Sequence, residues 1–355
     1  FAVDNANTSP VVLARPVVPK TGTWQFKTTP TKGYIILGKD DDTTDSAQFV
    51  RMINGYGYPV VLNSIPTNLN LNISSDADGA DTTYPSGSVS VFPDGGKAVD
   101  LYKYLVDNPE LGEVALHGAS EDQLWSSAAL TGDVLDTMFA TYTAGGGQKT
   151  KEELKDAIIS KYAETDVAQG AVRITDNRDI LEDGIGNFVY TIGKWGGDDD
   201  FVIDGITVGG TDDCPGGSSA VIDLIRQMDF MGYGLLTWNT ENDVQSPYWI
   251  FRNSSGLTPS EIDDMCERAF AYKCCIECFH HYYLSSPEQW VNFKNAMDTL
   301  KSYVDQGKVE VVTRKQYYEL GEFVSHPIVG IGLAVAELSY PTGTTLTDAD
   351  FTCTY

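Results

Sequence analysis

The chain has 355 residues with 24 Lys and Arg against 50 Asp and Glu, which gives a formal net charge of −26. Hydrophobic residues make up 42% of it, enough to bury a substantial core, so disorder throughout the chain is excluded. A surface this acidic repels phosphate backbones and anionic lipids, and we therefore expect neither nucleic-acid binding nor attachment to a membrane surface. Neutral or cationic ligands, and metal ions held by carboxylates, are compatible with this charge.

From about residue 32 the chain alternates short apolar runs with amphipathic segments, a pattern typical of alternating strands and helices. The apolar runs predict strands at 34–37, 59–63, 113–116, 202–208, 234–238, 276–279 and 309–312. Helices are predicted at 44–54, 97–106, 150–162 and 219–230, from 258, at 286–305 and from 313, several of them opened by capping-box sequences. Residues 64–93 are rich in Asn, Asp, Ser and Gly and are predicted to form a loop.

This alternation predicts an α/β protein with a parallel sheet, either a barrel or a doubly wound sheet. No repeat or low-complexity linker divides the chain, so we expect one main domain at 32–325 with loop insertions. An extended segment at 1–31 would precede it, and a β-like extension at 326–355 would follow it. In both architectures, functional residues gather at the carboxyl ends of strands.

The longest apolar run, residues 328–336, is far shorter than the roughly 20 residues that cross a bilayer, so we predict no transmembrane segment. The chain starts at Phe1, and its first 30 residues are rich in Pro, Thr, Val and Asn, which is typical of a processed, exported chain. We therefore expect a secreted, cell-surface or periplasmic location.

Six cysteines are present, and three of them form the motif Cys274-Cys275-x-x-Cys278. A structural zinc site would need further ligands at a matching spacing, and the remaining cysteines and histidines are irregularly placed for that purpose. Because cysteine packs well in protein cores, buried free thiols or a disulfide are the favoured interpretation.

Three predicted strands end in acids or histidines. Strand 34–37 leads to three consecutive aspartates at 40–42, strand 113–116 leads to His117 with Glu121 beyond it, and strand 276–279 leads to His280-His281. Acids and histidines that meet at one end of a sheet predict a divalent metal site with a general acid or base beside it. For any one of these motifs alone, a solvated loop or a helix cap is the competing interpretation.

The order of these motifs resembles the polysaccharide deacetylase superfamily, the NodB-homology carbohydrate esterases. The resemblance implies an irregular (β/α) barrel with loop insertions. In that family the first strand ends in an Asp pair, whose first member is the catalytic base and whose second is a metal ligand; here the pair would be Asp40 and Asp41. His117 matches the first metal His, and the family's catalytic acid corresponds to His280 or His281. Strand alternation places these two on opposite faces, and His280, the first residue past the apolar run, is favoured.

The chain also departs from the family pattern. Glu121 stands where the family has its second metal His, with Asp122 beside it. Either carboxylate could coordinate a divalent ion, and Glu121 would be the third ligand. Asp42 follows the Asp pair, and a register shifted by one would make Asp41 the base and Asp42 the ligand. The family's third motif carries an Arg that orients the base, whereas the corresponding segment here, Cys214-Pro215-Gly-Gly, has none.

The resemblance therefore implies metal-dependent hydrolysis of acetyl groups on an N- or O-acetylated polysaccharide or oligosaccharide, with zinc or another divalent ion as cofactor. The alternative is a non-catalytic glycan-binding or surface interaction protein on a decayed deacetylase fold. A third hypothesis is metal-dependent hydrolysis of a different kind of substrate.

Overall fold

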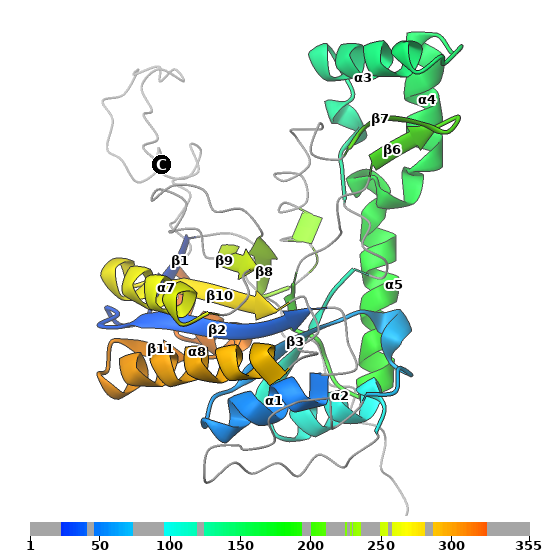
Figure 1. Cartoon of the computed structure of the whole chain (residues 1–355). Coiled ribbons are helices and arrows are strands. Elements are labelled where there is room, and N and C mark those ends of the chain that lie inside the picture. Colours follow the sequence, from blue (N-terminus) through cyan, green and yellow to red (C-terminus); the bar gives the residue numbers. More distant parts are fainter. Residues whose placement is uncertain are drawn as a thin grey trace, which may run out of the picture.

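A ring of parallel strands forms the centre of the molecule (Figure 1). The computed structural model describes residues 23–40, 46–73, 96–118, 124–193, 200–210, 224–225, 228, 230–235, 249–254, 258–280 and 287–324. The ring consists, in order, of β2 (Gly33–Asp40), β3 (Val60–Ser64), β4 (Gly112–Leu116), β5 (Thr191–Ile192), β8 (Gly232–Leu235), β9 (Trp249–Ser254) and β10 (Cys275–His280). β10 pairs again with β2, so the ring is closed. The predicted α/β class and irregular barrel are confirmed.

The barrel is irregular at β2. β3 pairs only with the carboxyl half of β2, from Gly38 to Asp40. β11 (Val309–Val311) pairs with the amino half, from Gly33 to Ile35. β2 therefore has β3 as its neighbour along its carboxyl half and β11 along its amino half.

Helices cover the outside of the barrel. They are α1 (Ser46–Gly55), α2 (Ala98–Asp107), α5 (Val167–Ile185), α7 (Pro259–Tyr272) and α8 (Pro287–Asp305). Outward side chains such as Ile35, Leu37 and Ile276 pack against them in the largest hydrophobic cluster. The alternate positions, including Tyr34 and Ile36, face inward into a second cluster. This period of two is the ordinary geometry of a strand with both faces buried.

The amino end of the barrel is closed by packed side chains. β1 (Thr23–Phe26) pairs antiparallel with β12 (Gly321–Val324), next to α9 (Arg314–Glu319). Trp24, Tyr317 and Tyr318 join Tyr34 in the inner cluster, and Trp24 Nε1 donates a hydrogen bond to the Tyr318 carbonyl at 3.2 Å. A functional site is therefore expected at the other end of the barrel, where the strands terminate.

A separate lobe stands at the far end of α5, away from the barrel (Figure 1). It contains α3 (Asp133–Ala144), α4 (Lys151–Lys161) and a hairpin of β6 (Asp200–Ile203) and β7 (Ile206–Gly210), with short 3-10 turns at Ser127–Ala129 and Ala163–Thr165. Trp125, Tyr142 and Phe201 belong to its own core. In the chain, the segments that form the lobe lie between β4 and β5 and between β5 and β8. Their apolar side chains pack against one another in a cluster separate from the core of the barrel.

The prediction of a single strand at 202–208 was wrong. The segment is an antiparallel hairpin whose turn residues, Asp204 and Gly205, both have positive φ (53° and 79°). An Asp-Gly pair between apolar runs is a strong signal for such a two-residue turn. α3, α5, β5 and β9 were not predicted from the sequence, and the short 3-10 turn Pro66–Asn68 lies where only a loop was predicted.

The other predicted elements that fall on described residues are confirmed to within a few residues at each end. Most of the predicted helix at 219–230, the end of the strand at 234–238 and most of the loop at 64–93 lie outside the described residues. Residues 1–22 and 325–355 also lie outside them, so the domain limits at 31 and 325 stay predictions. Among the described helices, none has the length and apolar character needed to cross a bilayer.

Four cysteines are buried free thiols: Cys266, Cys274, Cys275 and Cys278. Desolvation by burial raises the pKa of Cys266 to about 12 and that of Cys274 to about 11. This confirms the interpretation as buried thiols for these four, whereas Cys214 and Cys353 lie outside the described residues.

Candidate active site at the carboxyl end of the barrel

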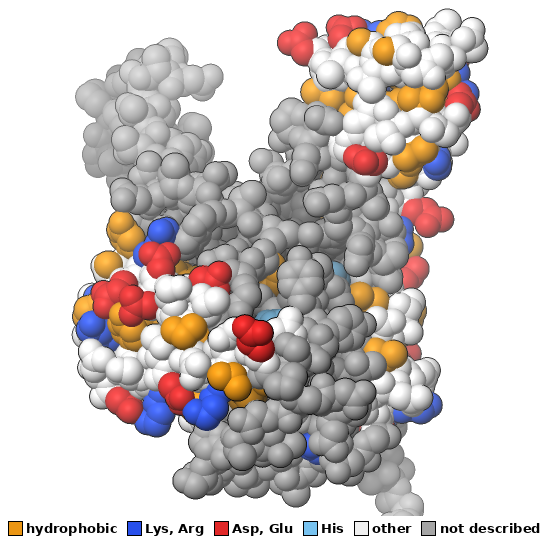
Figure 2. Space-filling model, viewed as in Figure 1, with side chains coloured by type: hydrophobic (Ala, Val, Ile, Leu, Met, Phe, Trp, Pro, Cys, Tyr) orange, Lys and Arg blue, Asp and Glu red, His pale blue; other side chains and the backbone are white. Residues whose placement is uncertain are grey.

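Asp40 and His117 lie together at the carboxyl end of the barrel. Asp40 is the last residue of β2, and His117 directly follows β4. His117 Nε2 lies 3.8 Å from Asp40 Oδ2, and only 2% of His117 and 1% of Asp40 are exposed. Figure 2 accordingly shows very little histidine surface on this face of the molecule. The structure thus brings together one predicted base and one predicted metal ligand.

Asn63 of β3 holds the other oxygen of the Asp40 carboxylate. Asn63 stands level with Asp40 in the register of the two strands. Its Nδ2 donates to Asp40 Oδ1 at 2.7 Å, and the Asn63 side chain is fully buried. Asp40 is therefore oriented with Oδ1 toward Asn63 and Oδ2 toward His117.

A buried ion pair lies next to Asn63 inside the barrel. Arg314, the first residue of α9, donates from Nη2 to Glu277 Oε1 at 2.8 Å and to Oε2 at 2.7 Å. Nη2 also donates to Asn63 Oδ1 at 3.1 Å. Both Arg314 and Glu277 are completely buried. Loss of one partner would leave an uncompensated charge in the barrel interior, which is strongly destabilising.

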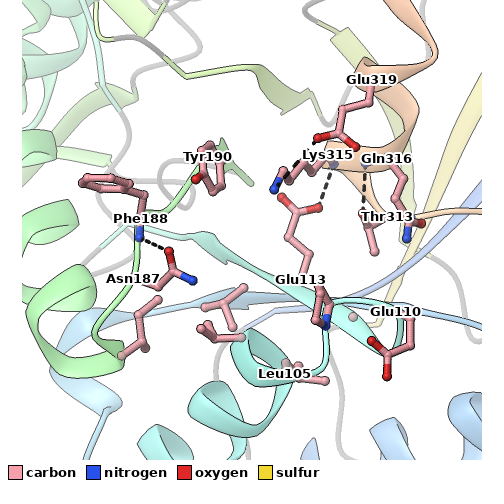
Figure 3. A pocket seen from close by; sticks show the side chains of 15 residues that line it. Leu105, Glu110, Glu113, Asn187, Phe188, Tyr190, Thr313, Lys315, Gln316 and Glu319 are labelled. Atoms are coloured by element: carbon pink, nitrogen blue, oxygen red, sulfur yellow. Dashed lines mark hydrogen bonds and ion pairs between the residues drawn. The ribbon is translucent and has the colours of Figure 1, made fainter. Parts of the chain in front are cut away.

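The polar contacts continue toward the amino end of the barrel. Arg314 Nη1 donates to Thr191 Oγ1 at 3.3 Å, and Thr191 Oγ1 in turn donates to the Glu113 carboxylate. Glu113 Oε2 also accepts from the backbone N–H of Lys315 at 2.8 Å. Burial raises the pKa of Glu113, against the lowering effects of Arg314 and of these hydrogen bonds. Glu113 lines a pocket together with Tyr190 and Lys315 (Figure 3). A continuous polar chain therefore links this pocket to Asp40.

His280 lies on the outer face of β10. Its ring centroid is 6.0 Å from that of Phe49 in α1 and 6.3 Å from that of Phe293 in α8. Along β10, Cys278 also faces outward into the main core, whereas Glu277 faces inward. The favoured candidate for the catalytic acid is thus packed between the barrel and its helices, on the opposite face from Glu277.

The remaining predicted site residues, Asp41, Asp42, Glu121 and His281, lie outside the described residues. Among the part of the chain that is described, no group of three or more His, Cys, Asp or Glu side chains is placed to hold a metal ion. Asp40 Oδ2 and His117 Nε2 supply one oxygen and one nitrogen donor, the donor types that zinc and similar ions accept. Their separation is too long for a direct hydrogen bond.

The tautomer of His117 bears on whether these residues suit a metal ion. Nδ1 of His117 faces the Gly118 carbonyl at 3.4 Å. A proton held there leaves the Nε2 lone pair directed toward Asp40, as in a metal-ligating histidine. The donor chemistry of this pair therefore fits a divalent ion.

Asn63, Thr191, Glu277 and Arg314 were not predicted from the sequence as site residues. Glu277 carries a signal in retrospect, because a charged residue in the apolar run 276–279 requires a buried partner. Asn63 is the last residue of the predicted strand 59–63, whereas Asp40 and His117 come after the predicted strands 34–37 and 113–116. Arg314 follows a helix cap at Thr313, and nothing in its local sequence distinguishes it from a surface arginine.

Three solved structures are similar to this chain over most of its length. A family 4 acetyl xylan esterase from Clostridium thermocellum, in complex with a cobalt ion, has a TM-score of 0.36 and 10% identity, covering 81% of this chain and 91% of that one. Peptidoglycan deacetylase PdaC from Bacillus subtilis has a TM-score of 0.36 and 13% identity, covering 82% and 93%. The catalytic domain of a peptidoglycan N-acetylglucosamine deacetylase from Eubacterium rectale has a TM-score of 0.37 and 10% identity, covering 81% and 91%. No protein-family model matches the chain, and no curated protein matches its sequence.

Proposed function

We propose that this chain is a hydrolase that removes acetyl groups from an N- or O-acetylated polysaccharide or oligosaccharide, with a divalent metal ion as cofactor. The observation that carries the proposal is the buried pair of Asp40 and His117 at the carboxyl end of a parallel barrel, 3.8 Å apart. The sequence motifs assign a base and a metal ligand to the same two residues. The proximity of the two side chains in the folded chain supports this assignment.

Asp40 is the proposed general base. Its Oδ1 is occupied by Asn63, so Oδ2 is the oxygen that would take a proton from the water attacking the acetyl carbonyl. His117, with Asp41 and Glu121, would hold the metal ion. A bound divalent ion would supply activation of that water and stabilisation of the developing negative charge.

His281 is the proposed general acid for the leaving amine or hydroxyl group. The ring of His280 packs against Phe49 and Phe293 on the outer face of β10. Within β10, Glu277 faces inward and His280 faces outward. Of the two histidines that the sequence offers for this role, we therefore propose His281.

The charge of the chain restricts the proposed substrate. A net charge of −26 disfavours strongly anionic glycans and is compatible with neutral or partly deacetylated, cationic ones. A secreted or surface location, as the N-terminal composition suggests, would place the protein where extracellular glycans occur.

The second candidate function is non-catalytic glycan binding on a decayed site. Two observations favour it: Glu121 stands where the resemblance expects a second metal His, and the Cys214-Pro215 segment has no Arg. The buried Arg314 reaches Asp40 only through Asn63, so it is not a direct replacement for that Arg.

Acetate release and metal content test the proposal. Purified full-length protein, loaded with zinc or cobalt, would be incubated with acetylated xylan and N-acetylated chitin oligosaccharides. We expect one metal ion per chain and acetate release that falls by about 10²–10⁴-fold in Asp40→Asn. Asp264→Asn, which changes an exposed carboxylate paired with Arg268, is the matched control.

Absence of bound metal together with no acetate release above the Asp40→Asn background would refute the hydrolase. Oligosaccharide binding without acetate release would instead support the glycan-binding alternative.

A further inference from the structure

Asn63 lies between a group that can only donate hydrogen bonds and groups that can only accept them. The guanidinium of Arg314 has no acceptor, and an ionised carboxylate has no donor. Asn63 Oδ1 faces Arg314 Nη2 at 3.1 Å, while its Nδ2 faces Asp40 Oδ1 at 2.7 Å and Glu277 Oε1 at 3.4 Å. A flipped amide would place NH₂ against the guanidinium and the carbonyl against both carboxylates. Only one orientation of Asn63 satisfies its neighbours.

We propose that Arg314 is a positioning residue for Asp40, acting through the Asn63 amide. Arg314 holds Asn63 Oδ1, which directs Nδ2 onto Asp40 Oδ1 and leaves Oδ2 facing His117. This inference rests on the proposed function, in which Asp40 Oδ2 receives the proton. Arg314 therefore orients the base although it lies on α9, at the opposite end of the barrel from the site.

The backbone is shaped to leave room for this network. A Cβ atom at Gly193 would lie 2.4 Å from Asn63 Oδ1 and 2.6 Å from Asn63 Cγ. A Cβ atom at Gly38 would lie 2.6 Å from Glu277 Oε1. Any side chain at either position would displace a member of the network. Glycine within β2 and glycine directly after β5 thus leave room for Glu277 and Asn63, respectively.

A purely structural role for Arg314 has to be separated from positioning. Arg314 also neutralises Glu277 in a fully buried setting, so Arg314→Met alone leaves an unpaired buried charge and is expected to be strongly destabilised. The double variant Arg314→Met/Glu277→Gln removes both charges together. If Arg314 serves only to neutralise Glu277, this charge-balanced variant should behave like the original protein. If Arg314 positions Asn63, it should not.

The test measures kinetics and the Asn63 side-chain amide in the same full-length variants. The double variant should unfold within a few degrees of the original protein and keep KM within twofold, while kcat falls at least tenfold. Selective ¹⁵N-Asn labelling, with Asn63→Leu to assign the signal, should show that the Asn63 NH₂ group is protected from hydrogen exchange originally and loses protection in the double variant. Arg268→Met, which removes an exposed arginine, should change neither readout.

The kinetic and hydrogen-exchange measurements each have an outcome that supports or overturns the positioning role of Arg314. A folded double variant with unchanged kcat and a still-protected Asn63 amide would overturn the positioning role. If the original protein releases no acetate, the proposed function fails while the amide measurement still decides whether Arg314 orients Asn63. Loss of protection in the double variant would then support the positioning role without catalysis.

Discussion

Asn63 donates its side-chain amide to the carboxylate of Asp40 at 2.7 Å, and the two residues are 23 positions apart in the chain. They meet because β2 and β3 are parallel neighbours with Asp40 opposite Asn63 in register. The contact leaves the second Asp40 oxygen facing His117. The orientation of the proposed base is thus decided by a pair of strands, and the partner that orients Asn63 comes from a helix at the far end of the chain.

Glycine at positions 38 and 193 is expected to be required by the buried network. We predict that Gly193→Ala and Gly38→Ala each lower the free energy of unfolding by about 1–3 kcal/mol, because the added Cβ meets side chains held on both sides. Urea denaturation followed by circular dichroism measures the change. Gly184→Ala is the control, because its Cβ meets only the flexible end of Leu69 and the residue lies in a helix. Equal stability of all three variants would contradict this prediction and show that the buried network accommodates an extra methyl group.

Glu113 is expected to make stability fall as pH rises. Burial raises its pKa in the folded protein above the unfolded value of about 4.3. Between these two pKa values the folded protein holds a proton on Glu113 that the unfolded chain releases. The free energy of unfolding therefore decreases as pH rises from the unfolded pKa to the raised folded pKa. Glu113→Gln removes the pH-dependent contribution of Glu113 to the free energy of unfolding. The variant should therefore gain stability relative to the original protein as pH increases from about 4.

Urea unfolding from pH 4 to 8 measures the Glu113 effect, with Glu110→Gln, an exposed neighbour in the same pocket, as control. A stability difference that does not vary with pH would contradict this prediction.

The four buried thiols are expected to be unreactive in the native protein. Burial raises the pKa of Cys266 to about 12 and of Cys274 to about 11, and it raises those of Cys275 and Cys278 well above the ordinary value. Because the thiolate is the reactive form, an aromatic disulfide reagent at pH 8 should label none of them. The background variant Cys214→Ser/Cys353→Ser restricts the assay to these four, and guanidinium chloride should expose all of them. Rapid native labelling would show that this side of the core opens.

Substitutions of the two adjacent histidines are expected to have different effects, one on catalysis and the other on stability. His281→Asn should lower kcat by about 10²–10⁴-fold with little change in stability, as expected for loss of a general acid. His280→Asn should instead lower the free energy of unfolding by about 1–3 kcal/mol, because it removes a ring packed against Phe49 and Phe293. Thermal unfolding and acetate release, measured on both variants, separate the two effects. A large catalytic loss in His280→Asn alone would reverse the assignment.

Local sequence was sufficient for several features of this protein. Alternating apolar runs and capping boxes predicted an α/β protein with a parallel sheet, because strand burial and helix initiation depend on neighbouring residues. That pattern left a barrel and a doubly wound sheet both open, and the resemblance to a known family implied the barrel. The position of Asp40 and His117 at strand ends was also predictable, since parallel strands present their carboxyl ends at one mouth. The missed hairpin at 200–210 had a local signal as well, in Asp204-Gly205.

Tertiary structure alone decided which residues surround Asp40. Glu277 and Arg314 lie 214 and 251 positions from Asn63, and only the closure of the barrel and the entry of α9 bring the three together. His280 likewise points to the outside of the barrel because Glu277, three residues earlier in β10, points to the inside. The sequence by itself determined the class of fold and the position of two candidate site residues at the ends of strands, because those follow from local pattern. The partners that orient them follow from contacts between distant segments, which no local pattern records.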